Sequence, residues 1–357
     1  RASAEALKQG MLELNPSLDI HVIDYFVTIA GPPFLHTFPK TYSKLAGNPA
    51  LWRLVWYGGL FPPTRFLFLG FLELLVKKKF EVVLDSLNPD LIVSVHPLCQ
   101  NVPVRVLKKR KPHIPFVTVV TDLGSAAPTW FHPGVDKCIV PTEHVYNIAR
   151  KCGLPDEKLS LIGLPVRQPF WGSPEFGSKR RARMSLELPS ADIPIVLLIG
   201  GGDGVGNLGR VAESVASELS KKFGKNEVQM VVICGRNKEL RSRLDSLEWP
   251  VSIRVEGFVK NMKDWMRACD IVVTKAGPGT IAEAFISELP IMLSGFLPGQ
   301  EAGNVSVVVD SKSGSFSKNP KIIAETVCLW CTDKNLRREL SQNSKRMGTP
   351  DATRKIS

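Results

Sequence analysis

Two glycine-rich turns are the features of this sequence best suited to bind a ligand. One lies in Lys275–Ala284, which reads KAGPGTIAEA, and the other in Leu197–Gly206, which reads LLIGGGDGVG. Glycine lets backbone amides come close to an anion, and the N-terminus of a following helix adds partial positive charge. Two such turns predict a site for phosphate groups, and a plain strand-to-helix turn is the alternative for each.

Polar residues that suit a sugar follow the second turn. Glu283 comes three residues after Thr280, and we expect its carboxylate to accept hydrogen bonds from a ribose diol. A capping box with Thr280 as the N-cap is the alternative. Gln300, Glu301 and Asn304 follow the next predicted strand and supply the donors and acceptors that sugar hydroxyls need, unless they form only a solvated loop. Two phosphate turns, a diol acceptor and this loop predict a nucleotide sugar as the ligand.

A dinucleotide site fits the turn at Gly200 less well. The GxGxxG spacing is absent, and no acid ends the next predicted strand. That strand ends in CGRN. Arg236 and Asn237 therefore either meet a nucleotide base or phosphate, or cap the following helix.

The first half of the chain contains three candidates for acid–base chemistry. His96, Asp122 and His132 each stand at or just beyond the end of a predicted strand. Ligands of parallel sheets lie at the carboxyl ends of the strands. A structural role is the alternative for each of the three.

These motifs need parallel sheets to bring the strand ends together. In the first half, helices predicted at 2–14, 64–80 and 102–109 alternate with apolar strands at 20–26, 91–97, 116–122 and 137–142. In the second half, strands at 193–202, 228–235, 252–258, 270–277 and 290–296 alternate with helices at 208–222, 237–244, 262–268 and 280–288. Helices between buried apolar strands predict an α/β fold with two Rossmann-like domains.

The limits of these domains follow from composition. A stretch rich in proline, glycine and charge covers 166–178, as a linker does. We predict an N-terminal domain over 1–165, a C-terminal domain over 179–345 and a terminal segment over 346–357. Because the chain begins at Arg1 inside a helical pattern and stops at Ser357 without a stop signal, we expect both ends to be cut.

Composition narrows the class of partner. The net charge of +12 indicates an anionic partner: nucleic acid, an anionic membrane or a phosphorylated ligand. Nucleic acid is disfavoured because the basic clusters are short and lack aromatics between them. The single CxxC pair, Cys328 and Cys331, has no second pair to complete a zinc site. The sequence contains no Asp-x-Asp motif of the kind that holds a metal ion on a diphosphate, so we expect no required metal ion. The apolar run 66–76 is too short to span a bilayer and forms either a core helix or a membrane-facing one.

Several longer motifs, in order, resemble a known family. They are SVHPLCQNVPVRVL, VTVVTDLGSAAPTWFH, GLPVR, VLLIGGGDGVG, ICGRN, TKAGPGTIAEA and GQEAGNV. They resemble the plant and algal monogalactosyldiacylglycerol synthases of glycosyltransferase family 28 and, more distantly, bacterial glycolipid and lipid-linked GlcNAc transferases. The resemblance runs from RASAEA to about residue 345.

The resemblance implies a fold, a reaction and a setting. The fold is GT-B, with two Rossmann-like domains facing a cleft. UDP-galactose is the donor, diacylglycerol the acceptor, and no cofactor is required. The setting is the chloroplast envelope, as a peripheral membrane protein that responds to phosphatidic acid and phosphatidylglycerol, and a homodimer is left open.

The resemblance also assigns residues. The donor site is expected to comprise Gly200, Gly201, Gly202, Arg236, Asn237, Gly257, Phe258, Lys275, Gly277, Pro278, Gly279, Thr280, Glu283, Gln300, Glu301 and Asn304. Contacts with the acceptor or with anionic lipid are expected from Pro32, Pro33 and Trp130. Direct displacement inverts the anomeric carbon, with Asp122 or His96 assisting the base.

Two departures from the family bear on activity. The family's expected main base is a His at the end of a glycine-rich turn just before RASAEA, and this chain begins after it. The family usually carries His where this chain has Ala127. We therefore expect residues 1–357 alone to be inactive yet able to bind donor. The alternatives are a related enzyme that uses UDP-glucose or UDP-GlcNAc and an inactive nucleotide-binding protein.

Overall fold

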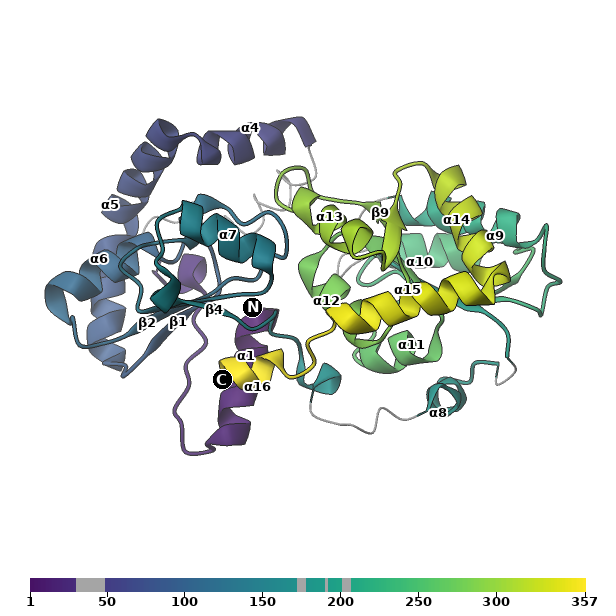
Figure 1. Ribbon diagram of the computed structural model, residues 1–357, viewed down its shortest axis with the longest axis horizontal. Coiled ribbons are helices and arrows are strands. Elements are labelled where there is room, and N and C mark those ends of the chain that lie inside the picture. The colour runs from purple at the N-terminus through teal and green to yellow at the C-terminus, as the bar shows by residue number, and fades with distance from the viewer. Residues whose placement is uncertain (30–48, 172–177, 190–191, 201–206) are drawn as a thin grey trace. The chain divides into compact units, whose positions relative to one another are not determined.

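The computed structural model describes residues 1–29, 49–171, 178–189, 192–200 and 207–357 (Figure 1). The chain divides into two compact units. Unit 1 comprises Arg1–Gln168, Leu297–Gly303 and Asp351–Ser357, and unit 2 comprises Pro169–Phe296 and Asn304–Pro350. The chain therefore passes from one unit to the other within the predicted linker and returns twice, and the sequence-based domain limits stay a prediction.

Unit 1 contains a four-stranded parallel sheet. Its order is β1 (Ile92–Ser94), β2 (Phe116–Val119), β3 (Lys137–Val140) and β4 (Leu159–Leu161). Its helices are α1 (Ala2–Leu14), α4 (Pro49–Leu60), α5 (Pro62–Leu87), α6 (Asn101–Arg110), α7 (Glu143–Lys151) and α16 (Ala352–Ile356). Figure 1 shows α16, in yellow, beside α1, in purple. Thr353 Oγ1 accepts from Val166 N at 3.0 Å and donates to Val166 O at 2.9 Å, so the C-terminal helix is tied to unit 1.

Unit 2 contains a six-stranded parallel sheet. Its order is β10 (Gly314–Phe316), β9 (Ile291–Gly295), β8 (Ile271–Lys275), β5 (Ile195–Ile199), β6 (Gln229–Ile233) and β7 (Ser252–Glu256). Its helices are α8 (Lys179–Ser185), α9 (Leu208–Leu219), α10 (Lys238–Asp245), α11 (Met262–Ala268), α12 (Pro278–Ile286), α13 (Ala302–Asp310), α14 (Pro320–Thr332) and α15 (Lys334–Met347). Strands β5 and β6 of this sheet are buried throughout.

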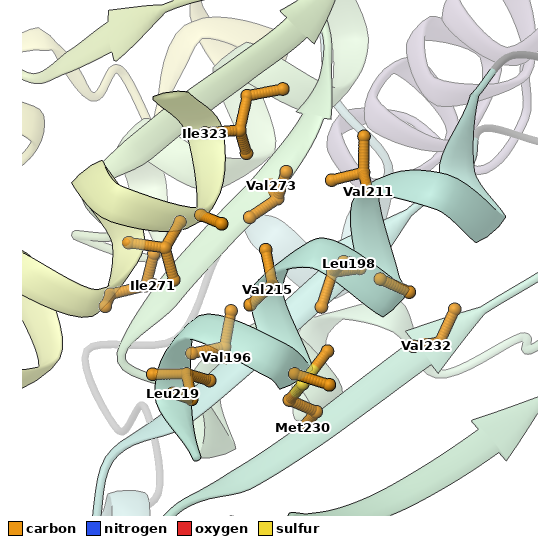
Figure 2. Close-up of a cluster of buried hydrophobic side chains, with 14 of the residues drawn as sticks. Val196, Leu198, Val211, Val215, Leu219, Met230, Val232, Ile271, Val273 and Ile323 are labelled. Atoms are coloured by element: carbon orange, nitrogen blue, oxygen red, sulfur yellow. The ribbon is translucent and has the colours of Figure 1, made fainter. Parts of the chain in front are cut away.

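The core of unit 2 shows how the spacing of apolar residues along a helix and a strand produces this packing. Val211, Val215 and Leu219 recur every four residues along α9 and form one apolar face. They belong to one buried cluster with Val196 and Leu198, which alternate along β5 (Figure 2). Burying a side chain of this size stabilises the fold by roughly 1.5–3 kcal/mol. This packing fixes the ends of β5 and its neighbours, where the predicted ligand residues lie.

The strand predicted over 20–26 is wrong. Residues 20–24 form no regular element, and Tyr25–Ile29 forms a short π-helix. Tyr25, Phe26 and Ile29 are buried in the core of unit 1, and the element packs against α5. The run of β-branched and aromatic residues resembles a strand, but tertiary packing selects a helical turn that directs these three side chains to one side.

Two helices begin two residues earlier than predicted, in each case at proline. α5 starts at Pro62 rather than at residue 64, and α12 starts at Pro278 rather than at Thr280. Proline fits the first helical position because its fixed φ suits the helix and its missing N–H costs no bond there. Among the described helices, no single one is long and apolar enough to cross a bilayer. Leu51–Leu60 and Pro62–Leu87, bent by 93°, meet that criterion only as a pair, by length and composition.

Candidate functional site

The ends of four adjacent strands carry most of the predicted donor residues of unit 2. Gly200 follows β5, Arg236 and Asn237 follow β6, and Gly257 and Phe258 follow β7. Lys275 ends β8 and leads into Gly277. The strands are parallel, so these residues lie along one edge of the sheet, where such sheets bind ligands. Gly201 and Gly202 lie outside the described residues.

Helix α12 presents its N-terminus at this edge. Gly277 occupies the N-cap and Pro278 the first helical position. The first N–H groups of a helix lack an intrahelical carbonyl, and this leaves the amides of Gly279 and Thr280 as donors. A Cβ built at Gly279 would meet no described atom within 4 Å. The first turn is therefore accessible and suited to an anion.

The structure corrects the expected cap of α12. Thr280 is the third helical residue and not the N-cap. Glu283 therefore lies in the second turn, beyond the reach of a capping box. Its side chain is buried, with 8% of its surface exposed.

Arg236 and Asn237 differ in what they contact. The Arg236 guanidinium lies over the Phe258 ring, 5.4 Å from its centroid, and this cation–π contact joins the ends of β6 and β7. Asn237 is the N-cap of α10, and its Oδ1 accepts from Leu240 N at 2.9 Å. One of the two predicted polar residues thus stabilises a helix end, whatever else it binds.

We expect Asn237→Ala to lower the free energy of unfolding by about 1 kcal/mol, the usual contribution of an N-cap side chain. Asn237→Asp should lower it much less, because aspartate caps a helix about as well as asparagine. Chemical denaturation of both variants measures the difference. Equal losses in the two would show that the cap does not account for the role of Asn237.

The predicted polar loop is divided between two elements. Asn304 lies in α13, is fully buried, and donates from Nδ2 to Ala276 O at 2.9 Å. It thereby fixes the turn between β8 and α12. Gln300 and Glu301 lie in the segment 297–303, which belongs to unit 1. The sequence placed all three in one loop, and the start of α13 at Ala302 separates them.

The segment 297–303 is attached to the residues that follow Asp122. Gly303 N donates to Ser125 Oγ at 2.6 Å, and a Cβ at Gly303 would overlap the Gly124 carbonyl. Within the segment, Glu301 Oε2 accepts from Leu297 N at 2.8 Å. Ser125 carries no signal of its own in the sequence, and only its position three residues after Asp122 could have indicated its place in this region.

Asp122 is the most strongly perturbed carboxyl group of this region. It is buried, with 6% of its surface exposed, and its Oδ2 accepts from Trp130 Nε1 at 2.7 Å. The pKa of Asp122 is raised to about 6, mainly by burial; the Trp130 hydrogen bond opposes this rise, and the charge of Glu301 contributes to it. Such a carboxylate is a stronger base than usual and still ionised at neutral pH.

His96 has a different environment. Its Nδ1 accepts from Leu98 N at 3.3 Å, so the neutral ring carries its proton on Nε2. Desolvation by the surrounding protein lowers its pKa to about 4, the α-amino group of Arg1 acts in the same direction, and Asp24 opposes both. The residue as a whole is nevertheless exposed to solvent. His96 is therefore a neutral N–H donor close to the first residue of α1.

His132 and Trp130 serve the local structure. His132 Nδ1 accepts from Gly134 N at 3.0 Å. Partial burial lowers the pKa of His132, and Lys108, Arg105 and Lys158 lower it further, so its charged surroundings differ from those of Asp122 and His96. Trp130 is 1% exposed. Pro32 and Pro33 lie outside the described residues, and among the described residues no three His, Cys, Asp or Glu gather as a metal site.

Comparison with known proteins gives two matching families. Residues 1–166 match the monogalactosyldiacylglycerol (MGDG) synthase model, and residues 195–294 match the glycosyltransferase family 28 C-terminal domain. The probable monogalactosyldiacylglycerol synthase 2, chloroplastic, of Oryza sativa subsp. japonica is 40% identical over 99% of this chain and 75% of its own length. Monogalactosyldiacylglycerol synthase 1, chloroplastic, of Arabidopsis thaliana is 38% identical over 100% of this chain and 67% of its own length.

Solved structures share the fold at low identity. MurG of Acinetobacter baumannii aligns with a TM-score of 0.58 and 13% identity, over 80% of this chain and 77% of that one. The glycosyltransferase of kitacinnamycin aligns with a TM-score of 0.55 and 15% identity, over 81% and 80%. These similarities, with the two parallel sheets and their helices, confirm the expected α/β fold of the GT-B class.

Proposed function

Because the chain belongs to the monogalactosyldiacylglycerol synthase family, we propose that it moves galactose from UDP-galactose to the sn-3 hydroxyl of 1,2-diacylglycerol. The product is monogalactosyldiacylglycerol, and the anomeric carbon is inverted. The observation that carries the proposal is the row of predicted donor residues at the carboxyl edge of the unit 2 sheet. Its relatives are named chloroplastic, and we assign the chain to the plastid envelope.

A UDP-sugar suits this edge electrostatically. The diphosphate is anionic, and the N-terminus of α12 offers amides and partial positive charge. Lys275 at the end of β8 and Arg236 after β6 place two cationic side chains at this edge of the sheet, with β5 between the two strands. When the glycosidic bond to UDP breaks, negative charge develops on the diphosphate, and fixed dipoles of this kind stabilise it without reorganising.

The acceptor chemistry requires a base. The diacylglycerol hydroxyl oxygen bonds to the anomeric carbon as the bond from that carbon to UDP breaks, and the hydroxyl proton must pass to a basic group. Within this chain we assign that role to Asp122, which is buried and ionised at neutral pH. His96 is assigned as an N–H donor that orients the acceptor. The His expected upstream of Arg1 stays a prediction, and its place next to α1 would set it near His96.

Transfer by the complete gene product tests the proposed function. The assay supplies diacylglycerol vesicles with UDP-galactose, UDP-glucose or UDP-GlcNAc, each with and without phosphatidic acid or phosphatidylglycerol. We expect galactose to be transferred in preference, and faster with the anionic lipids. Preferred transfer of glucose or GlcNAc would favour the related lipid glycosyltransferase. Nucleotide binding with no transfer of any sugar would favour an inactive binding protein.

Glu283 is proposed to bind the ribose diol. Hydrogen bonds to a charged group contribute about 1.5–3 kcal/mol, so Glu283→Gln should weaken UDP-galactose binding by roughly 10- to 150-fold. Titration calorimetry measures the affinity. Glu325→Gln is the matched control, because Glu325 is an exposed residue of α14 in the same unit. An unchanged affinity in Glu283→Gln would reject the ribose role.

A further inference from the structure

The segment 297–303, which carries Gln300 and Glu301, closes on itself as a tight turn. Leu297 N donates to Glu301 Oε2 at 2.8 Å, and Glu301 N donates to Leu297 O at 3.0 Å. Gly299 has a φ of +81°, a backbone conformation that favours glycine. These bonds fix the shape of the turn, and its position in unit 1 depends on contacts with other residues.

Two glycines of the turn lie against other parts of unit 1. A Cβ built at Gly299 would overlap the indole ring of Trp56 in α4. A Cβ built at Gly303 would lie 2.4 Å from the carbonyl group of Gly124 and 2.5 Å from Ser125 Oγ. Gln300 and Glu301 lie between these two glycines in the chain, so a shift of the turn at either contact would displace them.

The contact at Gly303 is directional as well as close. Gly303 N donates to Ser125 Oγ at 2.6 Å. A hydrogen bond constrains both a distance and an angle, whereas packing such as that of Gly299 on the Trp56 ring constrains mainly the distance. The hydroxyl group of Ser125 therefore sets where the turn lies in unit 1.

The stretch that contains Ser125 is itself held in place. Leu123 O accepts from Thr142 Oγ1 at 2.8 Å, and Thr142 is the N-cap of α7. Asp122 Oδ2 accepts from the buried Trp130 Nε1 at 2.7 Å. The hydrogen bond of Ser125 with the turn is thus made to a part of unit 1 that is fixed at two points.

The position of the turn has an electrostatic consequence for Asp122. Asp122 and Glu301 are both buried, and the charge of Glu301 raises the pKa of Asp122. Repulsion between like charges grows as they approach and as water is excluded between them. A shift of the turn away from Ser125 would therefore weaken this effect and make Asp122 a weaker base.

We propose that Ser125 is a positioning residue for galactosyl transfer: by accepting from Gly303 N, its hydroxyl group holds Gln300 and Glu301 at the donor hexose and near Asp122. The inference rests on the proposed function, in which Gln300 and Glu301 bind the donor and Asp122 is the base. Ser125 acts through the turn and needs no contact with either substrate.

Steady-state kinetics of the complete gene product test this role. Ser125→Ala should lower kcat/KM for UDP-galactose by about 2- to 10-fold, the effect of one lost hydrogen bond, and leave the affinity for UDP unchanged. It should also move the acid limb of the pH profile to lower pH, because Glu301 moves away from Asp122. Ser125→Thr keeps a hydroxyl group and should restore both values. An acid limb that stays in place in Ser125→Ala would overturn the proposal.

Gly303→Ala disturbs the same contact from the other side. Its Cβ would overlap Gly124, so this variant should lose at least as much kcat/KM as Ser125→Ala. Because the two residues share one contact, the double variant should lose little more than Gly303→Ala alone, and additive losses would contradict a direct link. Gly70→Ala is the control, since a Cβ there would meet no described atom within 4 Å.

Hydrogen exchange measures the anchoring of the turn without any need for catalysis. Amides of the segment 297–303 should exchange faster in Ser125→Ala than in the parent chain. Ser86→Ala should match the parent, because Ser86 is exposed on α5 and donates to Val83 O. Equal exchange in Ser125→Ala and the parent would overturn the anchoring. Absence of UDP-galactose binding and transfer in the parent would instead overturn the proposed function, and exchange would still decide whether Ser125 holds the turn.

Discussion

Asp122→Asn is expected to lower kcat of the complete gene product by about 10²- to 10⁴-fold, the usual contribution of a positioned general base. The amide oxygen of asparagine can still accept from Trp130 Nε1, as Asp122 Oδ2 does at 2.7 Å, so the fold and the donor affinity should be kept. Steady-state kinetics and UDP titration separate these effects. An active Asp122→Asn variant would transfer the role of base to the predicted upstream His.

The pH dependence gives a second measure of the same group. A base must be ionised, so kcat/KM should fall as the pH drops through about 6, where burial places the pKa of Asp122. The charge of Glu301 raises this pKa. Glu301→Gln should therefore move the acid limb of the profile to lower pH. An acid limb that stays in place in this variant would show that another group controls it.

The free energy of unfolding should change with pH in the opposite direction to kcat/KM, because it should rise as the pH falls. A carboxyl group whose pKa is raised from 3.8 to about 6 on folding holds its proton more tightly in the folded state. Protonation of Asp122 thus adds stability as the pH falls from about 6 toward 4, and that contribution is lost above pH 6. Comparing the pH dependence of unfolding in the parent chain and in Asp122→Asn isolates this contribution, because the variant cannot titrate there.

The sequence predicted those helices and strands in which the spacing of apolar residues matches the residues that are buried. The helices over 2–14 and 262–268 are confirmed at both ends. Five of the six strands of unit 2 are confirmed as shorter cores within the predicted ranges, for example Ile195–Ile199 within 193–202. The sixth, β10 (Gly314–Phe316), was not predicted. Strand prediction failed at Tyr25–Ile29, because composition there matches a strand while contacts with a distant helix decide the conformation.

The site was predictable only to the extent that it follows chain order. A ligand position at the end of a strand can be read from a motif such as that at Lys275–Gly277. The proximity of Glu301 to Asp122 cannot be read from a motif, because it depends on a segment that leaves unit 2 and returns to unit 1. The hydrogen bond of Asp122 with Trp130 likewise has no periodic signal. Tertiary contacts of this kind set the pKa that the proposed mechanism uses.

The largest expected effect on stability comes from Arg183 of α8. Its Nε donates to Ala268 O at 2.9 Å, and its guanidinium donates to Asp270 Oδ2 at 2.8 Å. The side chains of Arg183 and Asp270 are only 5% and 13% exposed. Asp270 Oδ2 also accepts from Ile195 N at 2.8 Å, so this pair links α8 to the starts of β5 and β8.

Arg183→Ala should lower the free energy of unfolding by up to about 3–5 kcal/mol, because it removes the buried partner of Asp270. The carboxylate then keeps only Lys179, whose Nζ lies 2.6 Å from Asp270 Oδ1 and whose side chain is 47% exposed. Lys334→Ala is the control and should have little effect, since the pair of Lys334 with Asp192 is 67% and 95% exposed and exposed pairs contribute little. Hydrogen exchange of peptides from β5 and β8 would localise the loss.

Donor binding gives the critical comparison for Arg183→Ala. Arg183 acts at the amino ends of β5 and β8, whereas Gly200 and Lys275 lie at their carboxyl ends. At a temperature where the variant is folded, its UDP affinity should therefore equal that of the parent chain. Weakened UDP binding in the folded variant would mean that the two ends of the sheet are coupled, and UDP affinity could then no longer be assigned to the strand ends and α12 alone.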